Sequence, residues 1–209
     1  MGAGALPDPV TTAQGLYPAE HRALRELHFA ARHLAGHWSK LAGRFGGEAA
    51  EVLERGSSSA RELLGELDER TAAHGLHGFP AAQGLGRGAS GVRGASDLLL
   101  ERNQVLRGAV GDAQHVTTLL AYLAELSARR QDAALTAWHH VWEARMRELE
   151  EAARAAAAAQ GRDPDGAIEP AERSALGRAG HSLANGLGTL GEAIDASVVG
   201  RAARRLRRR

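Results

Sequence analysis

Apolar and small residues recur along residues 24–67 at spacings of three and four, the period of one buried face of an α-helix. From 24 to 45 the spacing is that of a heptad seam, and from Trp38 onward it becomes an eleven-residue repeat. The seam stays in phase across Gly46 and Gly47. We therefore predict one long helix over about 19–74, roughly 80 Å in length. Two glycines cost about 1 kcal/mol each inside a helix, so a hairpin at this point remains an alternative.

Two further helices follow from the same kind of pattern. The second is predicted over about 97–159. Its seam falters at 127–131, where no glycine or proline stops the helix, and resumes at Ala134, Ala137, Val141 and Ala144. The third is predicted over about 170–200, with Pro170 suited to its first turn. Glycines in its interior include Gly180, Gly186, Gly188 and Gly191.

These elements predict an all-α protein. The expected architecture is an elongated antiparallel helical hairpin, in which two long helices pack as in a coiled coil and the third, glycine-rich helix joins them. The alternative is a ferritin-like four-helix bundle. That bundle requires a hairpin at Gly46-Gly47, a crossover through 75–96 and another break near 127–131.

Composition changes along the chain divide it into one domain and two tails. Residues 1–17 contain prolines and glycines without a period, which predicts a disordered N-terminal arm. Residues 18–200 form the single helical domain. The connection 75–96 contains seven glycines and reverses the chain. Residues 201–209 form a basic tail.

Composition also limits the chemistry. Apolar residues make up 44% of the chain and aromatic residues only 4%, so we expect a core of Leu, Ala and Val that packs helices closely. The absence of cysteine excludes disulfides and thiolate chemistry. No apolar run approaches the roughly 18 residues of a membrane span, and no signal peptide is evident, so a cytoplasmic location is expected.

The basic tail is the strongest electrostatic feature. Its six arginines attract phosphates of nucleic acid or of an anionic membrane surface. They lack interleaved aromatic residues, so sequence-specific readout is not expected. They are Arg201, Arg204, Arg205, Arg207, Arg208 and Arg209.

Two pairs of residues have the spacing of metal ligands. His33 and His37 lie four apart on one helix face, and His140 and Glu143 lie three apart on another. A two-helix hairpin would place both pairs at a similar height, where imidazole and carboxylate suit zinc or iron. Against this site, the histidines lie at or beyond the rim of the seam, and no Glu-x-x-His motif of diiron bundles occurs.

The same hairpin would bring Trp38 close to Trp138 within the core. No G-x-S-x-G motif and no phosphate-binding loop is present, which favours a non-enzymatic protein. The leading hypothesis is a scaffold that forms homo-oligomers and contacts a protein partner through the third helix and the tail. The alternatives are a ferritin-like metal-binding protein and a nucleoid-associated protein. A break at Gly46-Gly47 together with inward-facing His33, His37, His140 and Glu143 would favour the metal-binding alternative, and a continuous first helix with these residues facing water would exclude it.

Overall fold

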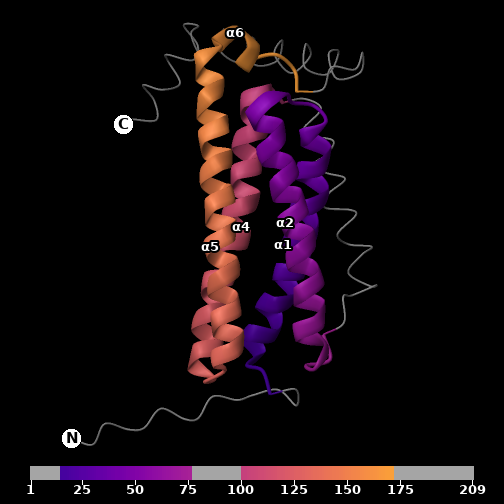
Figure 1. Cartoon of the computed structure of the whole chain (residues 1–209), viewed down its shortest axis with the longest axis vertical. Helices are drawn as coiled ribbons and strands as arrows, with labels where there is room; N and C mark the ends of the chain where they lie inside the picture. The colour runs from indigo at the N-terminus through magenta and orange to yellow at the C-terminus, as the bar shows by residue number, and fades with distance from the viewer. Residues whose placement is uncertain (1–14, 77–99, 172–209) are drawn as a thin grey trace, which may run out of the picture.

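A computed structural model describes residues 15–76 and 100–171. Within these ranges the chain is all-α, as predicted (Figure 1). A 3-10 turn at Gln160–Arg162 and the short helix α6, Pro164–Ala167, follow the last long helix. The long helices are α1, Pro18–Ala42; α2, Gly47–Ala72; α4, Arg102–Arg129; and α5, Ala133–Ala159.

The single helix predicted over 19–74 is wrong, because the chain reverses between α1 and α2. Gly46 is extended and caps α2, and Gly47 follows with a φ of +59°, a conformation that favours glycine. Phe45 and Ala49, on either side of this turn, are both buried. The spacing of buried residues is therefore the same in a hairpin as in one straight helix. For this reason the spacing could not distinguish a hairpin from a continuous helix.

The single helix predicted over 97–159 is also wrong, because α4 and α5 are separate. Gln131 adopts a left-handed φ of 62°, which costs a non-glycine residue about 1 kcal/mol. The Asp132 carboxylate offsets this cost by accepting a hydrogen bond of 2.9 Å from a backbone N–H in the first turn of α5. Arg130 binds both Asp132 and Glu20 of α1. Side-chain contacts thus stabilise the reversal between α4 and α5, although no glycine or proline in the sequence indicates a turn there.

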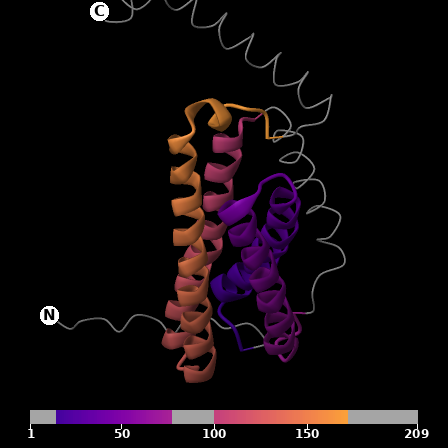
Figure 2. The same cartoon turned by 45° about the horizontal axis from the view of Figure 1, so that its top comes forward.

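The four long helices pack as two antiparallel pairs. α1 and α2 form one pair and α4 and α5 the other, and the pairs contact each other through α1 with α4 and α2 with α5 (Figures 1 and 2). Arg130, at the end of α4, contacts Glu20 at the start of α1, with 3.0 Å between guanidinium nitrogen and carboxylate oxygen. At the opposite end of the bundle, Arg102 lies over the ring of Phe45, 4.7 Å from its centroid. α1 and α4 are therefore antiparallel.

Because of these helix directions, the connection between α2 and α4 must run the length of the bundle. α2 ends where α1 starts, while α4 begins at the other end of the bundle (Figure 1). Leu76 and Leu100 thus lie at opposite ends, and residues 77–99 between them lie outside the described residues. Four-helix bundles with one long crossover have this order of helix directions.

The core runs along the centre of the bundle and is mostly Leu and Ala, as the composition predicted. Leu16, just before α1, is also fully buried. Glu101 caps α4, and its backbone pairs with that of Pro170, so Pro170 does not begin a helix at that residue. The remainder of the predicted third helix lies outside the described residues.

Within residues 15–76 and 100–171, no helix combines the length and apolar character that crossing a bilayer requires.

Candidate metal centre

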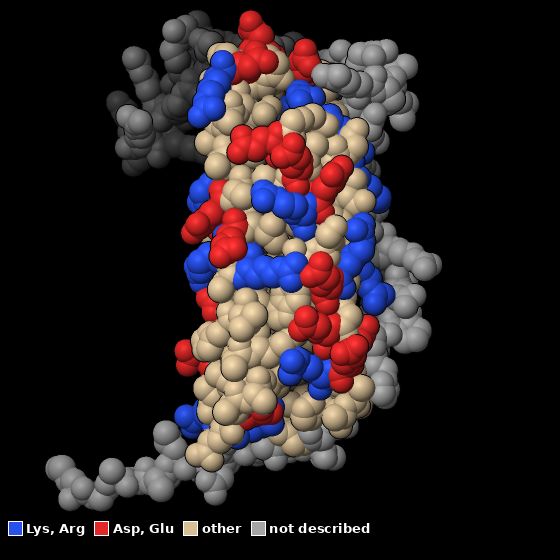
Figure 3. All heavy atoms as spheres, viewed as in Figure 1, with Lys and Arg blue, Asp and Glu red and all other residues tan. Residues whose placement is uncertain are grey.

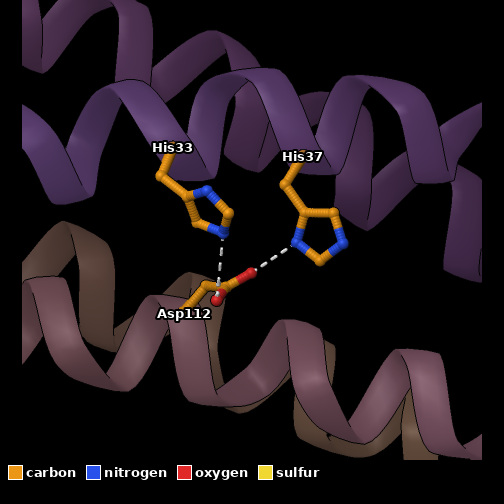
Figure 4. A group of neighbouring side chains, drawn as sticks. All are labelled: His33, His37 and Asp112. Atoms are coloured by element: carbon orange, nitrogen blue, oxygen red, sulfur yellow. Dashed lines mark hydrogen bonds and ion pairs between the residues drawn. The ribbon is translucent and has the colours of Figure 1, made fainter. Parts of the chain in front are cut away.

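A cluster of two histidines and one aspartate lies between α1 and α4. His33 and His37 are one turn apart on α1, so their rings project from the same face. Asp112 projects from α4 toward both rings (Figure 4). Among the described residues this is the one group of three ligand-type side chains close enough to share a metal ion, with their ligand atoms within 4.8 Å of one another.

The carboxylate of Asp112 lies between the two imidazoles. Nδ1 of His37 is 2.6 Å from Oδ2 of Asp112, a hydrogen bond, and Nε2 of His33 is 3.6 Å from Oδ1, an ion-pair distance. The Asp112 side chain is 2% exposed, and those of His33 and His37 are 13% and 11% exposed. The three groups therefore form a polar site that is nearly closed to solvent.

Asp112 is ionised despite its burial. Burial alone would raise the pKa of this carboxyl, because water no longer solvates the charge. The two imidazoles that face the carboxylate, those of His33 and His37, outweigh burial and lower the pKa of Asp112 to about 2. The site thus keeps a negative charge at neutral pH, which a cation would compensate.

His33 makes the least complete set of interactions in the cluster. Its Nε2 atom is buried and makes no hydrogen bond to any described residue. The ring lies 5.3 Å from that of His37, centroid to centroid, at an angle of 34°. A buried nitrogen that faces a carboxylate from beyond hydrogen-bond distance is suited to a ligand placed between them.

Two nitrogen ligands and one carboxylate oxygen suit zinc or non-haem iron. Bond lengths of about 2.0–2.2 Å keep neighbouring ligand atoms about 3 Å apart. The two distances to Asp112, 2.6 and 3.6 Å, bracket that value. All three ligand atoms lie within 4.8 Å of one another, so side-chain rotations would have to bring the most distant pair closer to surround one ion.

The other two predicted ligands lie elsewhere. His140 and Glu143 are on α5, where Nδ1 of His140 lies 3.4 Å from Oε2 of Glu143, and Glu143 also pairs with Arg147. The prediction assumed a hairpin in which this part of the chain faces His33. Once the chain reverses after α1, α4 becomes the antiparallel neighbour, and it supplies Asp112.

Asp112 was missed as a ligand, although the sequence contained a signal for it. It lies three residues after Ala109 and four before Val116, which is the spacing of the buried seam. A carboxylate at such a position requires a partner from another helix. The neighbouring helix, and thus the partner, depends on the two reversals that were not predicted.

The tryptophans occupy two separate places. Trp38 packs against Gly56 of α2, where an added Cβ would come within 2.2 Å of the indole ring. Trp138 and Trp142 of α5 both donate their indole N–H to Oε2 of Glu66, at 2.6 and 3.0 Å. Gly56 and Glu66 are ten residues apart on α2, about 15 Å. The expected contact of Trp38 with Trp138 is therefore replaced by separate contacts with α2.

A second buried polar pair, Ser127 and His139, joins α4 to α5. Nδ1 of His139 lies 3.2 Å from Oγ of Ser127, and both residues are fully buried. Oγ of Ser127 also lies 2.9 Å from the Leu123 carbonyl of its own helix. With no exposed atom for a substrate to reach, this pair has a structural role rather than that of a nucleophile and its base.

The predicted anionic-surface residues Arg201, Arg204, Arg205, Arg207, Arg208 and Arg209 lie outside the described residues. Comparison of the chain with models of protein families, with curated proteins and with solved structures found no match. Any statement about function therefore depends on the chain's own geometry.

Proposed function

We propose that this protein binds one divalent transition-metal ion, zinc or iron, through Nε2 of His33, Nδ1 of His37 and the carboxylate of Asp112. The observation that carries the proposal is the buried Nε2 atom of His33, which makes no hydrogen bond to any described residue and faces Asp112 at 3.6 Å. The three ligand groups point toward one another from two packed helices (Figure 4). The two imidazoles come from α1 and the carboxylate from α4.

Energetics favour a ligand at this position. An ionised carboxylate that is 98% shielded costs several kcal/mol unless its charge is compensated. Among its partners are His37, by a short hydrogen bond, and His33, by a longer contact. A divalent cation held by all three groups would neutralise Asp112 and bind the Nε2 atom of His33, which makes no hydrogen bond to any described residue.

The competing explanation is a purely structural contact in which the imidazoles link α1 to α4 without a metal. The two explanations differ in what they predict for added metal. A structural contact leaves the unfolding midpoint unchanged when zinc is added. A metal site raises it with metal concentration, because an ion that binds only the folded state stabilises that state.

The test starts with elemental analysis of tag-free protein and with zinc titration of metal-stripped protein against a competing chelator. We expect one equivalent of metal, and affinity lower by more than about 100-fold in His37→Gln and Asp112→Asn. The matched control is His140→Gln, a solvent-exposed histidine on α5. Absence of binding in the parent protein, or equal affinity in Asp112→Asn, would refute the proposal.

A scaffold function is the second candidate, and a surface feature supports it. Charged side chains of both signs are interspersed over the face in Figure 3 but become sparse toward the end of the bundle where α5 begins. The exposed residues there include Ala134, Ala137, Ala144 and Val141, whose side chain is 66% exposed. A Val141→Glu variant that converts an oligomer into a monomer would support self-association, and an unchanged solution mass would oppose it.

The nucleic-acid proposal concerns the basic tail 201–209 alone. Deletion of the tail should abolish binding to nucleic acid together with its salt dependence. If the protein without the tail still binds nucleic acid, the binding site lies in another part of the chain.

A further inference from the structure

A second histidine–carboxylate pair lies on the same two helices as the proposed metal centre. Nε2 of His115, on α4, is 3.2 Å from Oε1 of Glu26, on α1. His115 follows Asp112 by three residues, and Glu26 precedes His33 by seven, so both lie on the faces that carry the centre. The pair is offset from the centre by about one turn along α4, roughly 4.5 Å from Asp112, and by about two turns along α1, roughly 10.5 Å from His33.

The two pairs differ in their exposure to solvent. Side chains of Glu26 and His115 are each 53% exposed, whereas Asp112 is almost completely buried. A metal ion in solution carries a shell of water that it must exchange for protein ligands before it reaches Asp112. A buried site therefore requires a path by which the ion arrives.

We infer that Glu26 and His115 form a loading site, where an arriving divalent ion first exchanges water for protein ligands before it moves to His33, His37 and Asp112. This inference depends on the metal-binding function proposed above. A carboxylate and an imidazole are ligands for the same ions as the buried centre. Two exposed ligands bind weakly, which suits transient capture, and the three buried ligands provide the stable site.

Position supports transfer rather than two independent sites. The loading site and the centre are both made by α1 and α4, and Asp112 and His115 project from neighbouring turns of one helix. An ion held by His115 thus has the negatively charged Asp112 as its next ligand on the same helix. Removing the loading site should slow both uptake and release of the ion and leave the equilibrium affinity unchanged.

The experiment measures cobalt(II) uptake by metal-stripped, full-length protein in a stopped-flow spectrometer, and equilibrium affinity by chelator competition. We expect the double variant Glu26→Gln/His115→Gln to take up cobalt on the order of tenfold more slowly, with affinity within a factor of two of the parent. The control, His140→Gln/Glu143→Gln, removes a histidine–carboxylate pair from α5, which contributes no residue to the centre, and should load at the parental rate.

Three outcomes would overturn the loading site. An unchanged rate in the Glu26/His115 variant would show that ions reach the centre by another path. An affinity loss as large as that of His37→Gln would make the pair part of the stable site. A rate defect that disappears at about 1 M salt would reduce the effect to the charge of Glu26, because such salt screens charges beyond about 3 Å. Absence of cobalt binding in the parent protein would refute the metal-binding function itself, a result distinct from these three.

Discussion

Nδ1 of His37 donates a hydrogen bond to Oδ2 of Asp112 across the interface of α1 and α4, at 2.6 Å. The direction of this bond follows from the charge of Asp112. With its pKa lowered to about 2, the carboxylate is ionised and only accepts hydrogen bonds. The proton therefore lies on the nitrogen atom that we assign as a metal ligand.

Metal affinity should consequently fall as the pH is lowered. Nδ1 of His37 can bind a metal only after its proton has left, and both imidazoles must be neutral to act as ligands. We expect zinc affinity to decrease steadily from pH 7 to pH 5, as measured by chelator competition. Calorimetry in buffers of different ionisation enthalpy would count the protons released. Affinity that is constant over this range would contradict the assignment of the histidines as ligands.

The free energy of unfolding should also depend on pH, through His139. Burial lowers the pKa of His139 from 6.5 to about 4. Between these values the unfolded chain binds a proton that the folded chain does not, so stability falls as the pH decreases from 6.5 to 4. The loss approaches about 3 kcal/mol at pH 4. Asp112 adds a further loss as the pH falls from 3.8 toward 2, because its pKa is lower in the folded state.

Urea denaturation at several pH values would measure this dependence. His139→Leu should flatten the slope between pH 6.5 and pH 4, because the variant lacks the group that titrates. His140→Leu, which changes the neighbouring exposed histidine, is the control and should retain the slope. The same slope in His139→Leu and the parent protein would assign the pH dependence to other groups.

Two glycines of α2 should respond to alanine in opposite directions. An added Cβ at Gly56 would lie 2.2 Å from two ring carbons of Trp38, whereas one at Gly65 meets no atom within 4 Å. We expect Gly56→Ala to destabilise the protein by about 1–3 kcal/mol through overpacking. Gly65→Ala should stabilise it by up to about 1 kcal/mol, because alanine favours the helix. Equal effects on the thermal midpoint would show that Trp38 does not contact α2 as described.

Glu66 should link α2 to α5 through its two tryptophan partners. Hydrogen bonds from Trp142 and Trp138 lower the pKa of the Glu66 carboxyl and hold it ionised. Glu66→Ala removes the acceptor of both indole N–H groups and should cost about 1 kcal/mol of stability. Glu66→Gln retains an acceptor oxygen and should cost less. Glu62→Ala, which removes an exposed partner of Arg145, serves as the control in urea denaturation followed by tryptophan fluorescence.

The seam of apolar residues was sufficient to predict the all-α class and most of the buried positions. Leu24, Leu34 and Leu63, for example, lie on the seam predicted over residues 24–67 and are fully buried. The seam was wrong for α5, where Ala134, Ala137, Val141 and Ala144 are all exposed and Trp138, Trp142 and Met146 are buried instead. Helical periodicity indicates the buried face only where apolar residues mark that face clearly, as they do in α1, α2 and α4. Even in these helices the seam could not reveal where α1 and α2 separate, since Phe45 and Ala49 stay buried through the reversal.

The sequence by itself thus determined the buried faces of α1, α2 and α4 and the pairing of His33 with His37, which follows from one turn of helix. Only the tertiary structure determined that Asp112 lies beside these two histidines and that His140 and Glu143 lie elsewhere. This arrangement depends on the reversal at Gly46-Gly47 and on the contacts of Arg130 with Glu20 and Asp132. Such contacts join residues far apart in the chain, and their formation depends on the packing of all four long helices together.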